Sequence, residues 1–220
     1  MHWVNFPLMG IMLWSGLRIY WANDVYAFGI GSWEWFHFFP EGFYETFDLN
    51  QRLARGIAFH LAFAWLFVGN GLAYLAYLLA TGRIRDLVPT GAEWRAVART
   101  VLADVGIGTA PPAPRYNAAQ KASYTLVLVM GAVLVASGFA IYKPASLAWL
   151  TALFLGYETA RLVHFTVSAL FVLFLAVHLI QVARAGWRPF AAMFTGYERV
   201  RRRRPAPAVM TDTPEDEPDA

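Results

Sequence analysis

The sequence predicts an all-α membrane protein, a bundle of four transmembrane helices with both termini in the cytoplasm. Hydrophobic residues make up 58% of the 220 residues and charged residues only 15%, well below the roughly 25% typical of soluble domains. Four apolar stretches come close to the about 20 residues that are needed to cross a hydrocarbon core. Lysine and arginine gather in alternate connections, as they do in chains that cross a membrane repeatedly.

The four expected spans are Trp3 to Tyr20, Ile57 to Ala80, Ala122 to Tyr142, and Leu162 to Val182. The first is the weakest, because Arg18 interrupts it near its end. We expect residues 1–190 to form the membrane domain. Residues 191–220 are a basic cluster followed by an acidic, proline-rich stretch, which predicts a disordered cytoplasmic tail.

The basic residues set the orientation of these spans. The connection from Asn23 to Ala54 carries one basic and five acidic residues, whereas Gly82 to Lys121 carries six basic residues and the tail after Val182 seven. The first connection should therefore lie outside, and the other two segments in the cytoplasm. A short surface helix is expected in the cytoplasmic loop, at "AEWRAVARTVL". The net charge of +3 reflects this topology and gives no reason to expect nucleic acid as a partner.

Four of the five histidines fall at two depths. The stretch "HFTVSALFVLFLAVH" places His164 and His178 fourteen residues apart, which in a helix is ~21 Å along the axis and close to whole turns. With the expected orientation, His60 and His164 lie near the outer face, and His2 and His178 lie near the cytoplasmic face. Burying an imidazole without a partner costs roughly 1–3 kcal/mol, so each ring should have one.

Paired imidazoles on neighbouring helices favour haem, which takes one axial ligand on each face. A single zinc site is excluded, because the pairs lie ~21 Å apart while Zn–N bonds are ~2.0–2.1 Å. A haem with two histidine ligands has no open position for oxygen, so the expected chemistry is electron transfer. The alternative is that the histidines are core residues bonded to backbone or hydroxyl groups. The fifth, His37, is expected to be a surface histidine of the outer loop.

Smaller features agree with haem. Gly16 and Gly138 occur in a shared S-G-x-x-I-Y pattern, where a missing side chain would let a macrocycle approach, or alternatively let helices pack closely. Arg18, Arg55 and Arg161 fall near the outer ends of spans. We assign them as partners of the anionic haem propionates, the alternative being arginines that reach lipid phosphates.

The H-x13-H spacing in the last span, the histidines in three of four spans and "RYNAAQKASY" before the third resemble the bacterial cytochrome b561 group. That group includes the b-type cytochrome subunit of nickel–iron hydrogenases, the gamma subunit of formate dehydrogenase and thiosulfate reductase cytochrome b subunits. The resemblance covers roughly residues 1 to 190. It implies two haems b, the outer one held by His60 and His164 and the inner one by His2 and His178. Relatives carry a basic lead-in where His2 here follows Met1, so we expect an upstream start or a frayed ligand.

The resemblance also implies a quinone pocket beside the inner haem, at Asn117, Ala119, Gln120 and Lys121. Relatives often have glycine where this chain has Ala119. Asn117 can bond to a quinone carbonyl, and Lys121 can stabilise negative charge on it or relay a proton. The alternative is a helix N-terminus with Asn117 as its cap and Lys121 as an ordinary cytoplasmic cation.

These features predict a multi-pass electron-transfer subunit of a bacterial inner membrane. It would link a periplasmic oxidoreductase, of the hydrogenase, molybdenum or iron–sulfur type, to the quinone pool. One alternative is a self-contained cytochrome b561 that takes electrons from a soluble donor without a dedicated complex, and another is a non-redox membrane anchor. The aromatic outer loop could form an interfacial belt or dock a partner. The redox partner, the quinone and the direction of electron flow are not specified by the sequence.

Overall fold

The computed structural model describes residues 2–22, 27–30, 33–37, 39–109, 111–112 and 116–186. Met1–Leu173 form one compact unit, and the described part of a second unit is the end of the last helix from Phe174 on. The described chain is helical apart from one hairpin. Its elements are α1 (His2–Trp21), β1 (Ala27–Ile30), β2 (Trp33–His37), α2 (Glu41–Thr46), α3 (Leu53–Ala80), α4 (Ile84–Leu87), α5 (Gly91–Asp104), α6 (Ala118–Tyr142), α7 (Ala148–Leu153) and α8 (Tyr157–Ala185).

Three of the described helices are long and apolar enough to cross a membrane, namely Leu53–Ala80, Ala118–Tyr142 and Tyr157–Arg184. Large apolar side chains on all three remain exposed, among them Trp65, Val129 and Leu173, as expected of surfaces that face lipid. The chain is therefore a membrane protein. Helix α1 is 20 residues long but is not among the three, because polar and charged residues such as Arg18 lower its apolar content.

Helix α1 lies antiparallel to α3, and two contacts along their length fix this arrangement. Near one end, a Cβ added to Gly56 would lie 2.8 Å from Cβ of Arg18, closer than real Cβ atoms approach, and 3.3 Å from the carbonyl oxygen of Ser15, which is a tight contact. Toward the other end, Nδ2 of Asn70 donates to Oδ1 of Asn5 at 2.6 Å. Only glycine at position 56 allows the two backbones to come this close.

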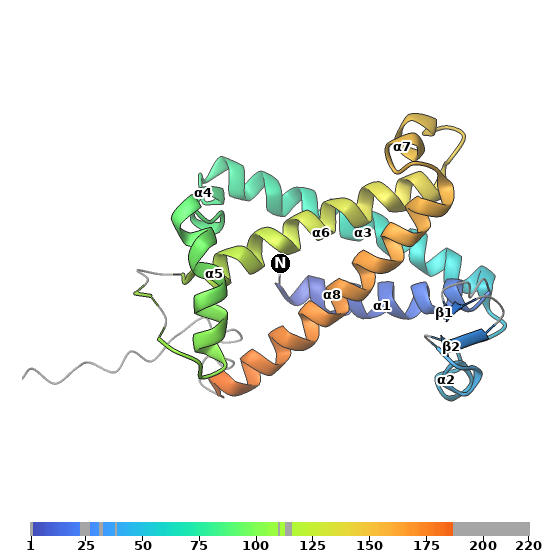
Figure 1. Ribbon diagram of the computed structural model, residues 1–220. Coiled ribbons are helices and arrows are strands. Elements are labelled where there is room, and N and C mark those ends of the chain that lie inside the picture. The colour runs from blue at the N-terminus through green and yellow to red at the C-terminus, as the bar shows by residue number, and fades with distance from the viewer. Residues whose placement is uncertain are drawn as a thin grey trace, which may run out of the picture. The chain divides into compact units, whose positions relative to one another are not determined.

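Short helices cover both ends of α6 (Figure 1). Helices α4 and α5 pack near its N-terminus, where Oγ1 of Thr125 donates to the Leu87 carbonyl at 3.0 Å. Helix α7 packs at its C-terminus, where Ala140 and Leu150 join Ala160 of α8 in a small buried cluster. The expected cytoplasmic surface helix is present as α5, which begins in a capping box formed by Thr90 and Glu93.

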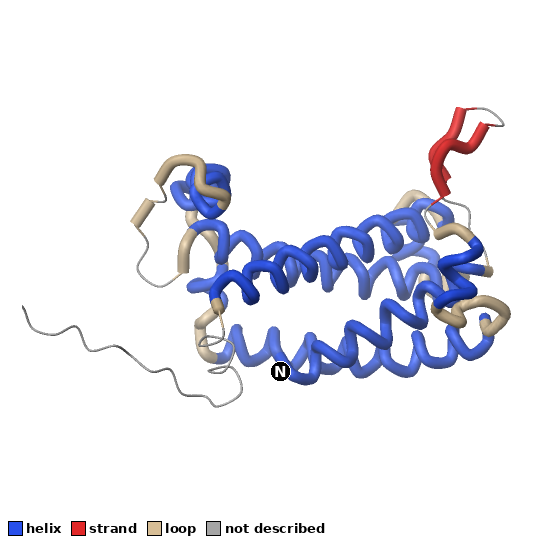
Figure 2. Tube along the Cα trace, turned by 90° about the horizontal axis from the view of Figure 1, so that it is seen from below, coloured by secondary structure: helices blue, strands red, loops and turns tan. Residues whose placement is uncertain are grey.

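The loop after α1 contains regular structure that the sequence analysis did not anticipate. Strands β1 and β2 form an antiparallel hairpin, red in Figure 2, in which Ala27 pairs with His37 and Phe28 with Phe36. The stretch "AFGIGSWEWFH" supplies aromatic residues that favour strands on either side of a Gly-Ser pair that favours a turn. The predicted all-α class holds for the long helices, and this two-stranded hairpin is a local addition in the loop. The expected cytoplasmic tail, residues 191–220, lies outside the described residues.

Candidate functional site

His60 of α3 and His164 of α8 lie side by side, with ring centroids 6.3 Å apart and ring planes inclined by 70°. This separation fits a metal between the rings. Metal–nitrogen bonds are about 2.0–2.1 Å at zinc sites, and a nitrogen lies about 1.1 Å from the centre of its ring. A metal in line between one nitrogen of each ring would therefore place the two ring centres about 6.2–6.4 Å apart. The structure thus brings together the two histidines that the sequence analysis assigned to the outer haem.

Each of these imidazoles contacts a serine on the neighbouring helix. The Oγ of Ser15 in α1 lies 3.0 Å from Nδ1 of His60, and the Oγ of Ser137 in α6 lies 3.0 Å from Nδ1 of His164. Both serines are fully buried. The sequence analysis noted the shared S-G-x-x-I-Y pattern but assigned a role only to its glycine, although the repeated serine carried an equal signal.

The glycines of the same pattern lie against the imidazoles. A Cβ added to Gly16 would lie 3.6 Å from Cε1 of His60, and one added to Gly138 would lie 3.4 Å from Cε1 of His164. Each glycine therefore faces a histidine ring, and an added Cβ would meet that ring at ordinary van der Waals distance. A third glycine, Gly56, permits the closest approach of α1 and α3 and was missed by the sequence analysis.

Arg18 is a buried cation with hydrogen-bonding capacity to spare. Its side chain is 3% exposed, Nη2 donates to the Asp48 carbonyl at 2.6 Å, and the guanidinium lies 4.3 Å from the ring centroid of Trp14. Its Nε and Nη1 are buried and have no hydrogen-bond partner. Leaving buried donors unpaired costs about 1–3 kcal/mol each, so this site fits an anionic group such as a haem propionate.

The other two predicted propionate partners differ from Arg18. Arg55 is exposed, and its guanidinium lies 5.7 Å from the ring centroid of Phe59. The side chain of Arg161 is 18% exposed, and its Nη1 pairs with Oε2 of Glu158 at 3.0 Å. Of the three arginines, Arg18 combines burial with unpaired donors and fits the predicted role best.

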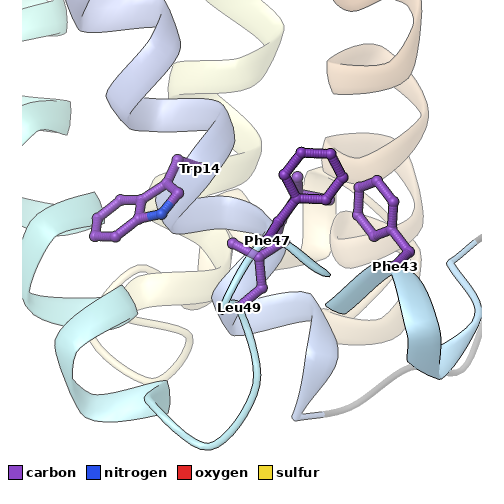
Figure 3. A pocket seen from close by; sticks show the side chains of 5 residues that line it. Trp14, Phe43, Phe47 and Leu49 are labelled. Carbon is purple, nitrogen blue, oxygen red and sulfur yellow. The ribbon is translucent and has the colours of Figure 1, made fainter. Parts of the chain in front are cut away.

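An apolar pocket lies beside this part of α1 (Figure 3). It is lined by Trp14, Leu17, Phe43, Phe47 and Leu49. Trp14 contributes its ring both to this pocket and to the cation contact with Arg18. Two residues of the aromatic outer loop, Phe43 and Phe47, line this pocket, and Phe47 remains exposed.

The inner histidine pair is only partly described. Helix α8 runs unbroken from Tyr157 to Ala185 and carries His178, whose ring stacks on Phe174 at 6.0 Å. The side chain of His2 lies outside the described residues. The pairing of His2 with His178 therefore stays a prediction. Among the described residues, no three histidine or acidic side chains are grouped as a metal site.

The residues predicted to bind quinone form the start of α6. Oδ1 of Asn117 accepts from the backbone N–H of Gln120 at 2.8 Å, and Oε1 of Gln120 accepts from the backbone N–H of Asn117 at 3.0 Å. The two residues thus make a capping box. Nζ of Lys121 pairs with Oε1 of Glu93 at 2.7 Å. The capping alternative is thus present in the structure. A quinone carbonyl would need a donor, which in Asn117 is Nδ2, whereas the cap uses Oδ1.

Paired imidazoles between apolar helices are the arrangement expected of a membrane cytochrome of the b type. The sequence model of the prokaryotic cytochrome b561 family matches residues 1–196, and the chain belongs to that family. It is also 31% identical over 202 residues to the "Putative protein-methionine-sulfoxide reductase subunit YedZ1" of Azospira oryzae, a match that covers 89% of this chain and 92% of the relative. No solved structure matches the chain.

Proposed function

We propose that this protein is a four-span, dihaem cytochrome of a bacterial inner membrane that passes electrons between quinol and a periplasmic oxidoreductase. Family membership makes it a b-type haem membrane protein, and haem supplies one-electron transfer when bound. The number of haems, the fourth span and the partner are our proposals. The observation that carries the site is the 6.3 Å separation of the His60 and His164 rings.

Two further features support the outer haem. The unpaired buried donors of Arg18 would be satisfied by a propionate. Arg55 and Arg161 lie near the N-terminal ends of α3 and α8, the helices that carry the two histidines. The inner haem, between His2 and His178, is supported by the fourteen-residue spacing within one unbroken helix. Helix α1 would be the fourth span, since it runs along α3 as far as the hydrogen bond from Asn70 to Asn5.

The relative named as a subunit of a protein-methionine-sulfoxide reductase suggests the class of partner. Reducing a sulfoxide to a thioether consumes two electrons and two protons and releases water. A partner of this class accepts electrons, so the flow would run from quinol through the inner and then the outer haem. Asn117, Gln120 and Lys121 would lie at the quinol end. A self-contained cytochrome without a dedicated complex remains the second candidate, and family membership weighs against the non-redox anchor.

Substitution of the ligands tests the haem assignment. His60→Ala and His164→Ala should each remove the outer haem and keep the inner one, because one axial ligand is lost and the other pair is untouched. His2→Ala and His178→Ala should do the reverse, and His37→Ala should keep both. The measurement is the pyridine haemochrome count per chain. Two haems per chain in His164→Ala would refute the pairing.

Substitution at the start of α6 tests the quinol end. Asn117→Ala should leave both haems bound, since no ligand is touched, and slow haem reduction by added quinol about 10–100-fold, the loss expected for a hydrogen bond worth about 1.5–3 kcal/mol. Because Asn117 also caps α6, Asn117→Ser is the control, since serine keeps a capping oxygen and lacks the amide donor. If both variants react at the parental rate, the pocket lies elsewhere.

A further inference from the structure

We propose that Ser15 and Ser137 are a matched pair of positioning residues that fix the tautomer and orientation of His60 and His164. The inference rests on the proposed function, because it concerns how these imidazoles are presented to haem iron. Each serine hydroxyl has one proton and two lone pairs. The hydrogen bond that uses the proton therefore determines what the hydroxyl presents to the imidazole.

The hydroxyl of Ser15 has one proton and three possible acceptors, of which the Ile11 carbonyl oxygen is the nearest. Its Oγ lies 2.7 Å from the Ile11 carbonyl oxygen and 3.1 Å from that of Met12, and a carbonyl oxygen can only accept. The proton therefore points at this backbone. Toward Nδ1 of His60, 3.0 Å away, the hydroxyl then presents a lone pair, so in this assignment Nδ1 is the donor and carries the proton.

Ser137 repeats this arrangement. Its Oγ lies 2.7 Å from the Val133 carbonyl oxygen, 3.3 Å from that of Leu134 and 3.0 Å from Nδ1 of His164, so by the same assignment it donates to the backbone and accepts from Nδ1. A neutral imidazole that carries its proton on Nδ1 has its remaining lone pair on Nε2. Both rings are thereby left with Nε2 as the nitrogen that can bind a metal.

The neighbouring glycines complete the positioning. A Cβ added to Gly16 or Gly138 would lie 3.6 or 3.4 Å from Cε1 of the facing histidine. Each ring therefore has a serine hydroxyl at Nδ1 and the backbone of a glycine beside Cε1. Hydrogen bonds of this kind orient a ligating histidine and raise its basicity, and their loss typically costs 10–100-fold in metal affinity. A more basic ligand favours oxidised iron, so the serines should lower the potential of the outer haem.

The chain offers a matched control for this proposal. Oγ of Ser168 in α8 also donates to the carbonyl four residues before it, that of His164, at 2.7 Å, but the bond that the structure gives it goes to backbone and not to an imidazole nitrogen. Ser168→Ala removes the same kind of backbone hydrogen bond as Ser15→Ala and Ser137→Ala. An effect specific to the imidazole must appear in the last two and not in the first.

The experiment measures the midpoint potential and the low-spin ferric electron paramagnetic resonance signal of each haem in purified protein. Ser15→Ala and Ser137→Ala should raise the potential and shift the signal of the outer haem alone, and their haem should dissociate about 10–100-fold more readily. Ser168→Ala should leave the potential, the signal and the haem dissociation unchanged. Equal behaviour of the three variants would overturn the proposal and make the serines ordinary helix-packing residues.

If the alanine variants lose the outer haem entirely, the comparison of Ser137→Thr with Ser137→Val decides. These two side chains have nearly the same shape and differ in a hydroxyl against a methyl group, so retention by threonine alone supports the proposal. Retention or loss by both contradicts it. The proposed function fails separately, when the parental protein shows no b-type haem at all.

Discussion

The two helix pairs that carry the central histidines present them in the same way but hold them differently. In both, a Ser-Gly step on one helix contacts an imidazole on the next, Ser15 with His60 and Ser137 with His164. Three residues after the serine, however, the first pair has Arg18 and the second has Ala140, and both are buried. The repeated pattern positions a ring, and the position that differs decides what else the site can bind.

The contacts that hold α1 and α6 in place also differ. Helices α1 and α3 touch backbone to backbone at Gly56. Helix α6 is joined to its surroundings by polar contacts of its ends, such as the ion pair of Lys121 with Glu93 and the bond from Thr151 of α7 to the Ala140 carbonyl at 3.2 Å. A close backbone contact cannot tolerate added atoms, whereas a surface ion pair can be lost at small cost. The predictions below follow from this contrast.

The largest effect is expected at Gly56. A methyl group there would lie 2.8 Å from Cβ of Arg18 and 3.3 Å from the Ser15 carbonyl oxygen, so Gly56→Ala must push α1 away from α3 at a cost of about 1–3 kcal/mol. Ser15 would move with α1 and release His60. We expect a lower melting temperature and partial loss of the outer haem, measured by thermal unfolding and haemochrome content.

Gly71 provides the control for this substitution, because it lies in the same helix and an added Cβ would meet no atom within 4 Å. Gly71→Ala should behave as the parent or be slightly more stable, since alanine favours helix. If Gly56→Ala matches Gly71→Ala in both measurements, the close contact does not hold the first pair together, and the contrast between the pairs disappears.

Much of this site could be predicted from the sequence, and the reason is periodicity. The apolar stretches located the long helices, and the depth of each histidine, counted along its helix, placed His60 beside His164. The contact at Gly56 could not be found in this way, because it depends on where two helices cross and nothing in its local sequence differs from other helical glycines. The hairpin was missed because its short aromatic alternation is hidden within an aromatic loop.

A smaller effect is expected from the arginine that distinguishes the two pairs. Arg18→Met keeps most of the volume of a buried cation whose ion pair with Asp48 is long, at 3.8 Å, whereas Arg161→Met removes a cation that is paired with Glu158 at 3.0 Å. If Arg18 binds a propionate, Arg18→Met should lower haem affinity on the order of tenfold and lower the potential of the outer haem, because positive charge near iron favours the reduced state. Arg161→Met should do less of both. Equal potentials in the two variants would remove the special role of Arg18.

The smallest effect is expected at the surface contact of α6 with α5. The hydrogen bond from Lys121, followed by one from the Thr90 backbone, lowers the pKa of the Glu93 carboxyl to about 2. A carboxyl whose pKa is lower in the folded than in the unfolded state stabilises the fold above its unfolded pKa, about 4.5 here, and ceases to do so as the pH falls toward 2. Glu93→Gln should therefore lower the melting temperature slightly above pH 5, and the difference from the parent should shrink as the pH falls below about 4.5 and be nearly gone at about pH 2, as measured by thermal unfolding across this range. At each pH, the variant and the parent should have the same haem content and haem potentials, because neither helix pair is disturbed. A difference that persists at the acidic end would mean that Glu93 acts through its cap on α5 and not through the charge of Lys121, and α6 would then have to be held by its packing, as α1 is.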